Sequence, residues 1–320
     1  MKCIATLTMN PAVDIAYDTD RLVPDHKLRT DPEQYDPGGG GINVARVIAQ
    51  LGGAARAYYL AGGVMGAVMD DLLRRERVDC RRIDVGGNTR VSIAVYERET
   101  GRQFRLVPPG PSISEAEWRM CLERLREVEC DYLVLSGSLP IGVPDDFYAR
   151  VQEAVRERGI EIILDSSGES LRCALEKGGL LLVKPSRREL EQVAGRELKT
   201  VSQIAAAAHG MVTKGQASLV AVTLGAEGAM LAQRSGVLHM PAMPVTARST
   251  VGAGDSFLGA MTMALAELRD PVEAFRFGMA AGTAAVLNQG TALARPADVE
   301  RILATMAVPT PVAGIGATAS

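Results

Sequence analysis

A glycine-rich stretch in the last quarter of the chain, "STVGAGDSFLGA", places an aspartate at the start of an apolar segment. Gly252, Ala253 and Gly254 can form a turn whose backbone amides bind an anion at the start of a helix. Phosphoryl transfer needs such positioned donors, together with a base for the attacking hydroxyl. The stretch therefore predicts either a catalytic base at Asp255 or, more simply, a side chain that caps the helix.

A second glycine run, "DPGGGGINVARVIAQLGG", precedes another helical pattern near the N-terminus. Backbone amides at Gly39 and Gly40, with the side-chain amide of Asn43, could bind a polyhydroxylated or anionic ligand. A flexible turn is the alternative. A dinucleotide-binding loop fits poorly, because a long segment separates these glycines from the first strand.

Four charged side chains have the right chemistry for phosphate or metal. Lys184 follows a strand and could meet a phosphate, and Glu189 in the next helical turn could hold Mg²⁺ through water. Arg90 and Arg105 lie on the two arms of a candidate hairpin and could grip a phosphate dianion. Taken singly, each of the four could instead be a solvated surface charge.

Short apolar runs that end in turn residues alternate with amphipathic stretches, which predicts parallel strands joined by helices. The strands are expected at 3–8, 55–62, 131–138, 160–167, 180–186 and 218–225. The helices are expected at 41–53, 69–78, 114–128, 144–159 and 187–195. A sequence "VTLGAEGAML" reads as a strand, a turn and another strand. Ligands of such sheets bind at the carboxyl ends of the strands, so the Ser, Asp, Lys-Pro and Thr-Leu-Gly endings should face one crevice.

Two segments, 16–39 and 88–110, interrupt the alternation and contain no helical pattern. The second alternates to Glu97, turns at "RETGR" and continues as "QFRLV", which is typical of a hairpin. We expect about 16–38 and 88–108 to form a small antiparallel sheet that acts as a lid, and its exposed edge favours a homodimer. The lid would belong to one domain, 1–307, followed by a flexible tail at 308–320.

The overall composition fits a cytoplasmic enzyme or binding protein. The 320 residues carry a net charge of −3, which argues against nucleic acid as a partner. Five scattered cysteines indicate reduced thiols rather than disulfides or a zinc site. We see no signal peptide and no apolar run long enough to span a membrane. The three histidines form no evident catalytic triad.

Taken together, these motifs resemble the PfkB (ribokinase-like) carbohydrate kinases over nearly the whole chain. The glycine runs are accompanied, in the family's order, by "TLTMNPAVD", "SGSLPIGVP", "DSSGESL", "LVKPS", "VTLGAEGA" and "LNQGT". The resemblance implies an α/β ribokinase-like three-layer fold, with a central mostly parallel sheet and a small antiparallel β lid. It is greatest for the hexose-phosphate branch, which implies ATP-dependent phosphorylation of fructose 6-phosphate to fructose 1,6-bisphosphate in glycolysis.

The resemblance also implies a role for each matching residue. Asp255 would be the base, and the turn at Gly252, Ala253 and Gly254 would be the anion hole. The substrate would be held by Asp14, Gly39, Gly40, Asn43 and Ser138, its phosphate by Arg90 and Arg105, and Lys27 would reach between sugar and nucleotide. ATP would contact Lys184, Ser186, Thr223, Gly225, Gly228, Met279 and Thr283. Glu189 would serve Mg²⁺, and a monovalent cation such as K⁺ would lie near Ser249, Val251, Ala285, Asn288 and Gly290.

Two positions qualify the resemblance. The family's Asn-x-x-Glu motif reads Ser186-Arg187-Arg188-Glu189 here, which puts the detailed geometry of the Mg²⁺ site in question but not the reaction. Gly40 stands where kinases of fructose 1-phosphate usually have a lysine, which favours fructose 6-phosphate. Tagatose 6-phosphate or fructose 1-phosphate remain alternative substrates. A non-catalytic sugar-phosphate sensor is disfavoured because Asp255, Gly252, Gly254 and Lys184 are all present.

Overall fold

The computed structural model describes residues 2–288 and 292–315. Within these ranges ten strands form one sheet in the order β14-β13-β12-β11-β10-β9-β8-β1-β4-β5. Its parallel part comprises β1 (Ile4–Thr8), β4 (Ala55–Ala61), β5 (Asp79–Asp84), β8 (Tyr132–Ser136), β9 (Glu161–Asp165), β10 (Leu180–Val183) and β11 (Ala217–Thr223). An antiparallel extension comprises β12 (Ala229–Gln233), β13 (Gly236–Met240) and β14 (Thr310–Pro311).

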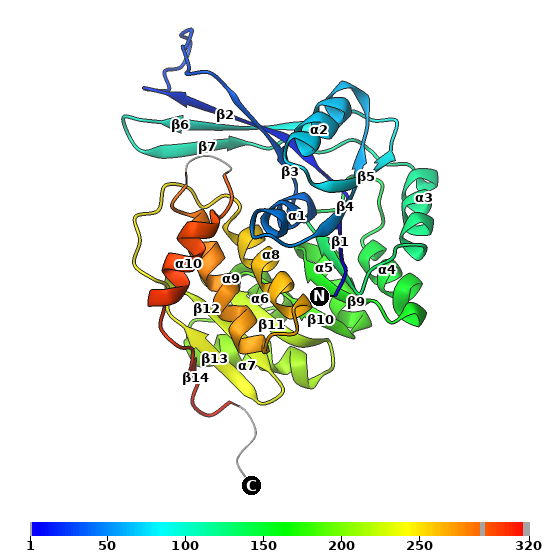
Figure 1. Ribbon diagram of the computed structural model, residues 1–320, viewed down its shortest axis with the longest axis vertical. Coiled ribbons are helices and arrows are strands. Elements are labelled where there is room, and N and C mark those ends of the chain that lie inside the picture. Colours follow the sequence, from blue (N-terminus) through cyan, green and yellow to red (C-terminus); the bar gives the residue numbers. More distant parts are fainter. Residues whose placement is uncertain (1, 289–291, 316–320) are drawn as a thin grey trace.

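Helices cover both faces of this sheet, as expected for strands that are buried on two sides (Figure 1). One face carries α1 (Gly40–Gln50), α8 (Ala253–Ala266), α9 (Pro271–Ala285) and α10 (Pro296–Thr305). The other carries α3 (Glu115–Arg126), α4 (Phe147–Val155) with the 3-10 turn η1 (Arg156–Arg158), α5 (Gly168–Lys177), α6 (Arg187–Ala194) and α7 (Val201–Thr213). These three layers confirm the predicted architecture.

A second sheet of four described strands stands off the main body (Figure 1). Its order is β3 (Gln34–Gly38), β2 (Ala12–Thr19), β6 (Arg90–Glu97) and β7 (Arg102–Leu106). The outer pairings are antiparallel, including the expected β6–β7 hairpin, whereas β2 and β6 pair in parallel. The lid is therefore a mixed sheet. Its two central strands belong to segments far apart in the chain, so they need not pair antiparallel as the strands of a hairpin do.

The two faces of the lid differ in chemistry. One face carries small and polar side chains such as Asp14 and Ser92, whose positions are directly opposite each other. The other carries Val13, Ile15 and Tyr17, which pack against a third core cluster that contains residues of α1 and of α2 (Gly63–Arg75). Because side chains alternate along a strand, the polar side chains all lie on the same face of the lid.

Several elements differ from the sequence-based expectations. Helix α2 begins at Gly63 rather than at 69, and α5, α7, α9 and α10 were not predicted. Part of the expected tail is ordered, since β14 pairs with β13 and the amide of Val312 donates to the carbonyl of Val237 at 2.9 Å. Among the described helices, none is long and apolar enough to cross a membrane.

Candidate active site

A cavity of about 300 Å³ lies between the lid and the carboxyl ends of β8 and β9. The first turns of α1 and α8 and part of α6 complete its wall. It is lined by Ala12, Asp14, Gly39, Gly40, Asn43, Arg90, Ser92, Arg105, Val107, Ser136, Gly137, Ser138, Asp165, Ser166, Ser167, Glu189, Val251, Gly252 and Asp255. The fold thus brings together most of the residues predicted to bind sugar or to react.

The predicted base lies in the first turn of α8. Gly252 precedes this helix with a φ of 73°, a left-handed conformation that favours glycine. Asp255 does not cap the helix, which has no side-chain cap among the described residues, and its Oδ2 instead accepts a hydrogen bond from Nδ2 of Asn43 at 2.8 Å. Burial raises the pKa of Asp255, and Asn43 and Lys184 act in the opposite direction. A carboxylate with a raised pKa beside free helix amides suits a general base for a phosphorylated reactant.

A buried ion pair stands beside that turn. Lys184 Nζ lies 3.1 Å from Asp165 Oδ1, and both side chains are largely inaccessible. A Cβ atom added at Gly254 would lie 3.4 Å from Lys184 Nζ, so the ammonium group borders the proposed anion hole. Burial acts to lower the pKa of Lys184, but the charge of Asp165, its hydrogen bond and the charges of Glu189 and Asp255 together outweigh burial, so the pKa is raised. Lys184 is therefore held in its cationic form, which suits a phosphate.

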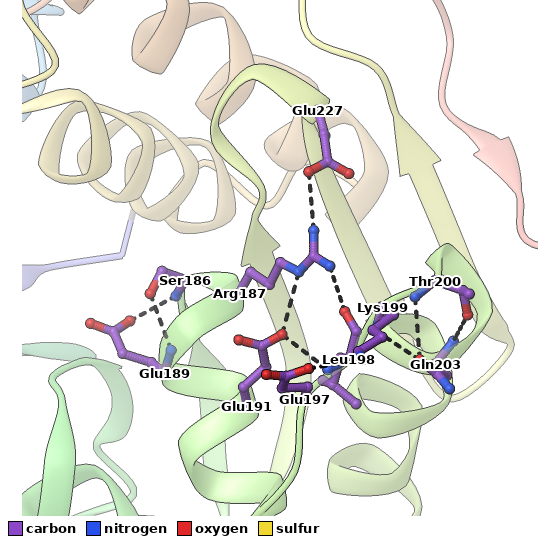
Figure 2. Close-up of polar contacts among 10 residues, drawn as sticks. All are labelled: Ser186, Arg187, Glu189, Glu191, Glu197, Leu198, Lys199, Thr200, Gln203 and Glu227. Carbon is purple, nitrogen blue, oxygen red and sulfur yellow. Dashed lines mark hydrogen bonds and ion pairs between the residues drawn. The ribbon is translucent and has the colours of Figure 1, made fainter.

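The first turn of α6 is organised by Ser186 and Glu189 (Figure 2). The Ser186 amide donates to Oε2 of Glu189 at 2.7 Å, and the Glu189 amide donates to Oγ of Ser186 at 3.3 Å, which is a capping box. Arg187 leaves this turn in the other direction and donates to Glu227 Oε1 at 3.1 Å and to the carbonyl of Leu198 at 2.6 Å. Ser186 is thus a helix cap here, and Arg187 ties α6 to the turn η2 (Gly225–Glu227).

The lid contributes an acid and two arginines. Burial raises the pKa of Asp14 to about 6, although Arg105 and a hydrogen bond from Ser92 lower it. The Arg90 guanidinium donates to the carbonyls of Asn10 at 2.8 Å and Pro108 at 3.2 Å, while its buried Nε has no protein partner among the described residues. Two arginines beside a carboxylate suit a sugar phosphate. The carboxylate can accept a hydrogen bond from a sugar hydroxyl, and the arginines can donate hydrogen bonds to the phosphate.

Gly40 packs closely against the end of β8. A Cβ atom there would lie 2.2 Å from Oγ of Ser136, at the end of β8. A larger side chain would require the Ser136 hydroxyl to turn away and the backbone of Ser136 and Gly137, at 3.0 and 3.1 Å, to shift slightly. The cavity floor at this point is therefore formed by backbone and a serine hydroxyl.

The residues predicted for ATP lie beyond this cavity. Thr223 ends β11, its amide bonds to the carbonyl of Pro185 at 3.0 Å, and Gly225 and Gly228 bound the turn that follows. Met279 and Thr283 are on α9, where Met279 is buried in the core and Thr283 is partly exposed. None of these five lines the 300 Å³ cavity. Their role in binding ATP stays a prediction.

Two chain segments meet at the residues predicted for a monovalent cation. The amide of Arg248 donates to the carbonyl of Val286 at 2.8 Å, which places the segment containing Ser249 and Val251 beside the end of α9 at Ala285. Asn288 is buried and donates to the carbonyl of Leu293 at 2.8 Å. Gly290 lies outside the described residues. The neighbouring backbone is compatible with a carbonyl-lined cation site, which stays a prediction.

Lys27 is not brought to the cavity. It lies exposed in the segment between β2 and β3 and is not among the lining residues. Asp165, Ser136 and Arg46, in contrast, belong to the site or its support but were not singled out from the sequence. Asp165 had a signal, since the aspartate that ends "IEIILD" was expected to face the crevice. Arg46 had one too, as a lone charge in the apolar run "NVARVIAQL".

Comparison with known proteins places this geometry in a family. The family model described as pfkB family carbohydrate kinase matches residues 7–298. The chain is 43% identical to "ATP-dependent 6-phosphofructokinase isozyme 2" of Mycobacterium tuberculosis over 311 residues, 97% of this chain and 91% of that protein. It is 43% identical to the Escherichia coli protein of the same name over 302 residues, 94% of this chain and 98% of the relative.

A solved structure gives the same result. The crystal structure of phosphofructokinase-2 from Escherichia coli in complex with potassium superposes with a TM-score of 0.92 at 42% identity, covering 95% of this chain and 99% of that one. The match extends over the lid as well as the main sheet, because nearly all of both chains is aligned. The chain therefore belongs to the pfkB family of carbohydrate kinases.

Proposed function

We propose that the chain is a 6-phosphofructokinase, which transfers the γ-phosphoryl group of ATP to the 1-hydroxyl of fructose 6-phosphate. The observation that carries this proposal is that one cavity is lined by Asp255, by Gly252 of the glycine turn and by the two lid arginines. Relatives that cover almost the whole chain carry that activity in their names. The same cavity contains a candidate base and two arginines that can bind a phosphate, and a substrate with both a reacting hydroxyl and a phosphate requires both.

In this proposal Asp255 takes the proton of the attacking hydroxyl. The free amides of the first turn of α8, at Ala253 and Gly254, meet the negative charge of the transferring phosphoryl group. The charge of Lys184 adds to theirs. Positioning and charge neutralisation account for most catalysis of phosphoryl transfer, so little further covalent chemistry is needed.

The substrate would lie across the cavity towards the lid. Asp14 and Asn43, with the amides of Gly39 and Gly40, would bind the sugar hydroxyls together with Ser138. Arg90 and Arg105 would hold the 6-phosphate, since no other arginine lines this cavity within the described residues. Gly40 supports fructose 6-phosphate over fructose 1-phosphate, because no side chain at this position can contact a phosphate on the sugar.

ATP and Mg²⁺ would approach from the side of α6 and η2. Mg²⁺ is usually held by one or two carboxylates together with substrate phosphates. Glu189 lines the cavity and suits that role, and the described residues contain no ready-made cluster of three metal ligands. We further propose that K⁺ binds near Ser249, Val251, Ala285 and Asn288. A relative was crystallised with potassium, which supports this assignment.

We also propose a homodimer formed through the lid. The lid face opposite the cavity continues onto the edge strands as exposed apolar side chains, with Tyr35, Phe104 and Leu106 being 43%, 43% and 61% exposed. Exposed apolar surface on a sheet edge is typical of an interface. Replacing Leu106 by Glu should give monomers in light scattering, whereas Leu268→Glu, at an exposed leucine outside the lid, should leave the dimer intact. The free thiols of all five cysteines support a cytoplasmic location.

A substrate panel tests the proposed reaction. The purified protein is given ATP and Mg²⁺ with fructose 6-phosphate, tagatose 6-phosphate, fructose 1-phosphate, fructose or ribose, and kcat/KM is measured for each. We expect fructose 6-phosphate to be preferred, with tagatose 6-phosphate second because it differs only at C4. A preference for an unphosphorylated sugar would overturn the assignment, and binding of fructose 6-phosphate without turnover would indicate a sensor.

A further inference from the structure

Beneath the proposed active site, Arg46 contacts the amide that holds Asp255. We propose that Arg46 is a positioning residue, which locks Asn43 in the orientation that donates a hydrogen bond to the catalytic base. This inference rests on the proposed function. It concerns a residue that does not line the cavity and that touches neither the sugar nor the nucleotide in the proposed complex.

The contact is buried and well defined. Arg46 is 4% exposed, and its Nη1 donates to Oδ1 of Asn43 at 3.1 Å. The two residues are three positions apart on α1, so they lie on one face of the helix. On its other side the Asn43 amide donates from Nδ2 to Oδ2 of Asp255 at 2.8 Å. A continuous chain of hydrogen bonds therefore runs from Arg46 to the base.

The chemistry of the amide makes this arrangement directional. An asparagine has an oxygen that accepts and a nitrogen that donates, and it can rotate to exchange them. In the exchanged orientation the Asn43 oxygen would face the carboxylate of Asp255 and its NH₂ would face the guanidinium of Arg46. Both contacts would be repulsive. Arg46 thus selects the orientation in which one oxygen of Asp255 is held and the other is left for the hydroxyl proton.

The guanidinium of Arg46 is itself bound to three other residues, so its orientation is fixed. Its Nε and Nη2 form a two-point ion pair with Glu76, which follows the last turn of α2, at 2.5 and 2.6 Å. Nη1 also donates to the carbonyl of Pro37 at 2.9 Å, and Nη2 lies 3.5 Å from Oδ1 of Asp36, both on β3. A planar guanidinium with donors in fixed directions can satisfy all of these partners, whereas a lysine cannot.

Other charged side chains lie near Asp255, and their effects on its pKa must be distinguished from the effect of Arg46. Lys184 follows β10, Arg105 extends from β7, Asp165 ends β9 and Glu189 lies on α6. Burial raises the pKa of Asp255, and Asn43, Lys184, Arg46 and Arg105 lower it in that order. Removing Arg46 loses both its charge and the alignment of Asn43. The acid limb of kcat/KM against pH should therefore move to higher pH.

A double-mutant cycle separates positioning from mere support of the fold. We expect Arg46→Met to lower kcat at saturating substrates by about tenfold to a hundredfold, with a smaller change in KM for fructose 6-phosphate. In an Asn43→Ala background the same substitution should change kcat by less than about threefold, because the contact through which Arg46 acts is already gone. Equal losses of kcat in the two backgrounds would overturn the proposal.

A matched variant controls for stability. Glu76→Gln replaces the two-point ion pair with a weaker hydrogen bond to a neutral amide, while Arg46 keeps its charge and its bonds from Nη1 to Pro37 and Asn43. It should therefore lower Tm while leaving the acid limb in place. If Arg46→Met does not fold, Arg46→Lys enters the same cycle, and non-additivity with Asn43→Ala is again the expected result. An acid limb that moves equally in Glu76→Gln and Arg46→Met would refute the proposal. Absence of turnover in the unmodified protein would instead refute the proposed function.

Discussion

Asn43 Nδ2 lies 2.8 Å from Asp255 Oδ2, although the two residues are 212 positions apart in the chain. The bond joins the first turn of α1, beside the glycines proposed to bind sugar, to the first turn of α8, which follows the proposed anion turn. The two helices also pack against each other along their length. The parts of the site proposed to bind sugar and to transfer phosphate are therefore joined by direct contacts.

The first prediction concerns the base. Asp255→Asn should lower kcat by at least about 10²–10⁴-fold, because the variant cannot accept the hydroxyl proton. Binding of fructose 6-phosphate, measured by calorimetry, should be largely kept. Asp270→Asn is the control, since Asp270 is exposed, caps α9 through the Val272 amide at 2.8 Å and does not line the cavity. Turnover of Asp255→Asn within tenfold of the parent would contradict the role of base.

The second prediction concerns the choice of a phosphorylated sugar. Arg105→Ala should lower kcat/KM for fructose 6-phosphate by about tenfold to a hundredfold, because a charge-assisted bond to phosphate is worth roughly 1.5–3 kcal/mol. The poor rate with fructose should hardly change. Arg90→Ala should act likewise but also lose stability, since Arg90 bonds to two carbonyls of the protein.

The control for the arginines is Arg102→Ala, an exposed residue of the same strand as Arg105 that does not line the cavity. It should leave the ratio of the two kcat/KM values unchanged. An equal loss with fructose and fructose 6-phosphate in Arg105→Ala would show that Arg105 shapes the lid and does not read the phosphate.

The third prediction concerns the departure from the family motif at Ser186. Ser186→Asn should leave the Mg²⁺ dependence of the rate nearly unchanged, because Asn caps helices about as well as Ser and Glu189 keeps its place. Ser186→Ala should lower the free energy of unfolding by about 0.5–2 kcal/mol through loss of the cap. A much lower Mg²⁺ requirement in Ser186→Asn would mean that the serine is a handicap in metal binding.

The fourth prediction is a pH dependence of stability. The pKa of Asp14 is raised from 3.8 to about 6 in the folded protein. Between these values the folded state binds more protons than the unfolded state, so this group lowers the free energy of unfolding as pH rises. Asp14→Asn should therefore be more stable than the parent at pH 7–8, by about 1–3 kcal/mol, and lose that advantage towards pH 4.

Thermal unfolding without ligands at several pH values measures this difference. Asp18→Asn, on the same strand but 37% exposed, should show a smaller effect. The Asp14 variant should at the same time bind fructose 6-phosphate poorly. A stability gain that is the same at pH 4 and pH 8 would mean that ionisation of Asp14 is not its source.

The strands of the main sheet were predictable because each is a short apolar run that ends in a turn, as in "DYLVLSGS" for β8. Helices α7 and α9 were harder to recognise, since both are rich in alanine and glycine and their buried faces carry little contrast with the exposed ones. The parallel pairing of β2 with β6 could not be predicted. It joins residues about 80 positions apart, and no local pattern encodes such a partner.

The site was predictable where a residue follows a strand or a glycine turn, as with Asp255 and Lys184. The site was less predictable where a residue supports it without lining the cavity. Arg46 appears in the sequence as one charge in an apolar helix, and only the packing of α1 against β3 and α2 reveals its partners. Lys27, in contrast, was predicted to belong to the site but does not line the cavity. Its predicted role depends on bound ligands and on the position of the lid.

The short strand β14 has a consequence for aggregation. Thr310 and Pro311 pair with His239 and Leu238 and so cover part of the outer edge of β13. A proline at that place also cannot extend the ladder to a further strand. Proteins cut back to residue 307 would present the bare edge of β13 to one another, and self-association of such truncated forms should follow from this loss of protection.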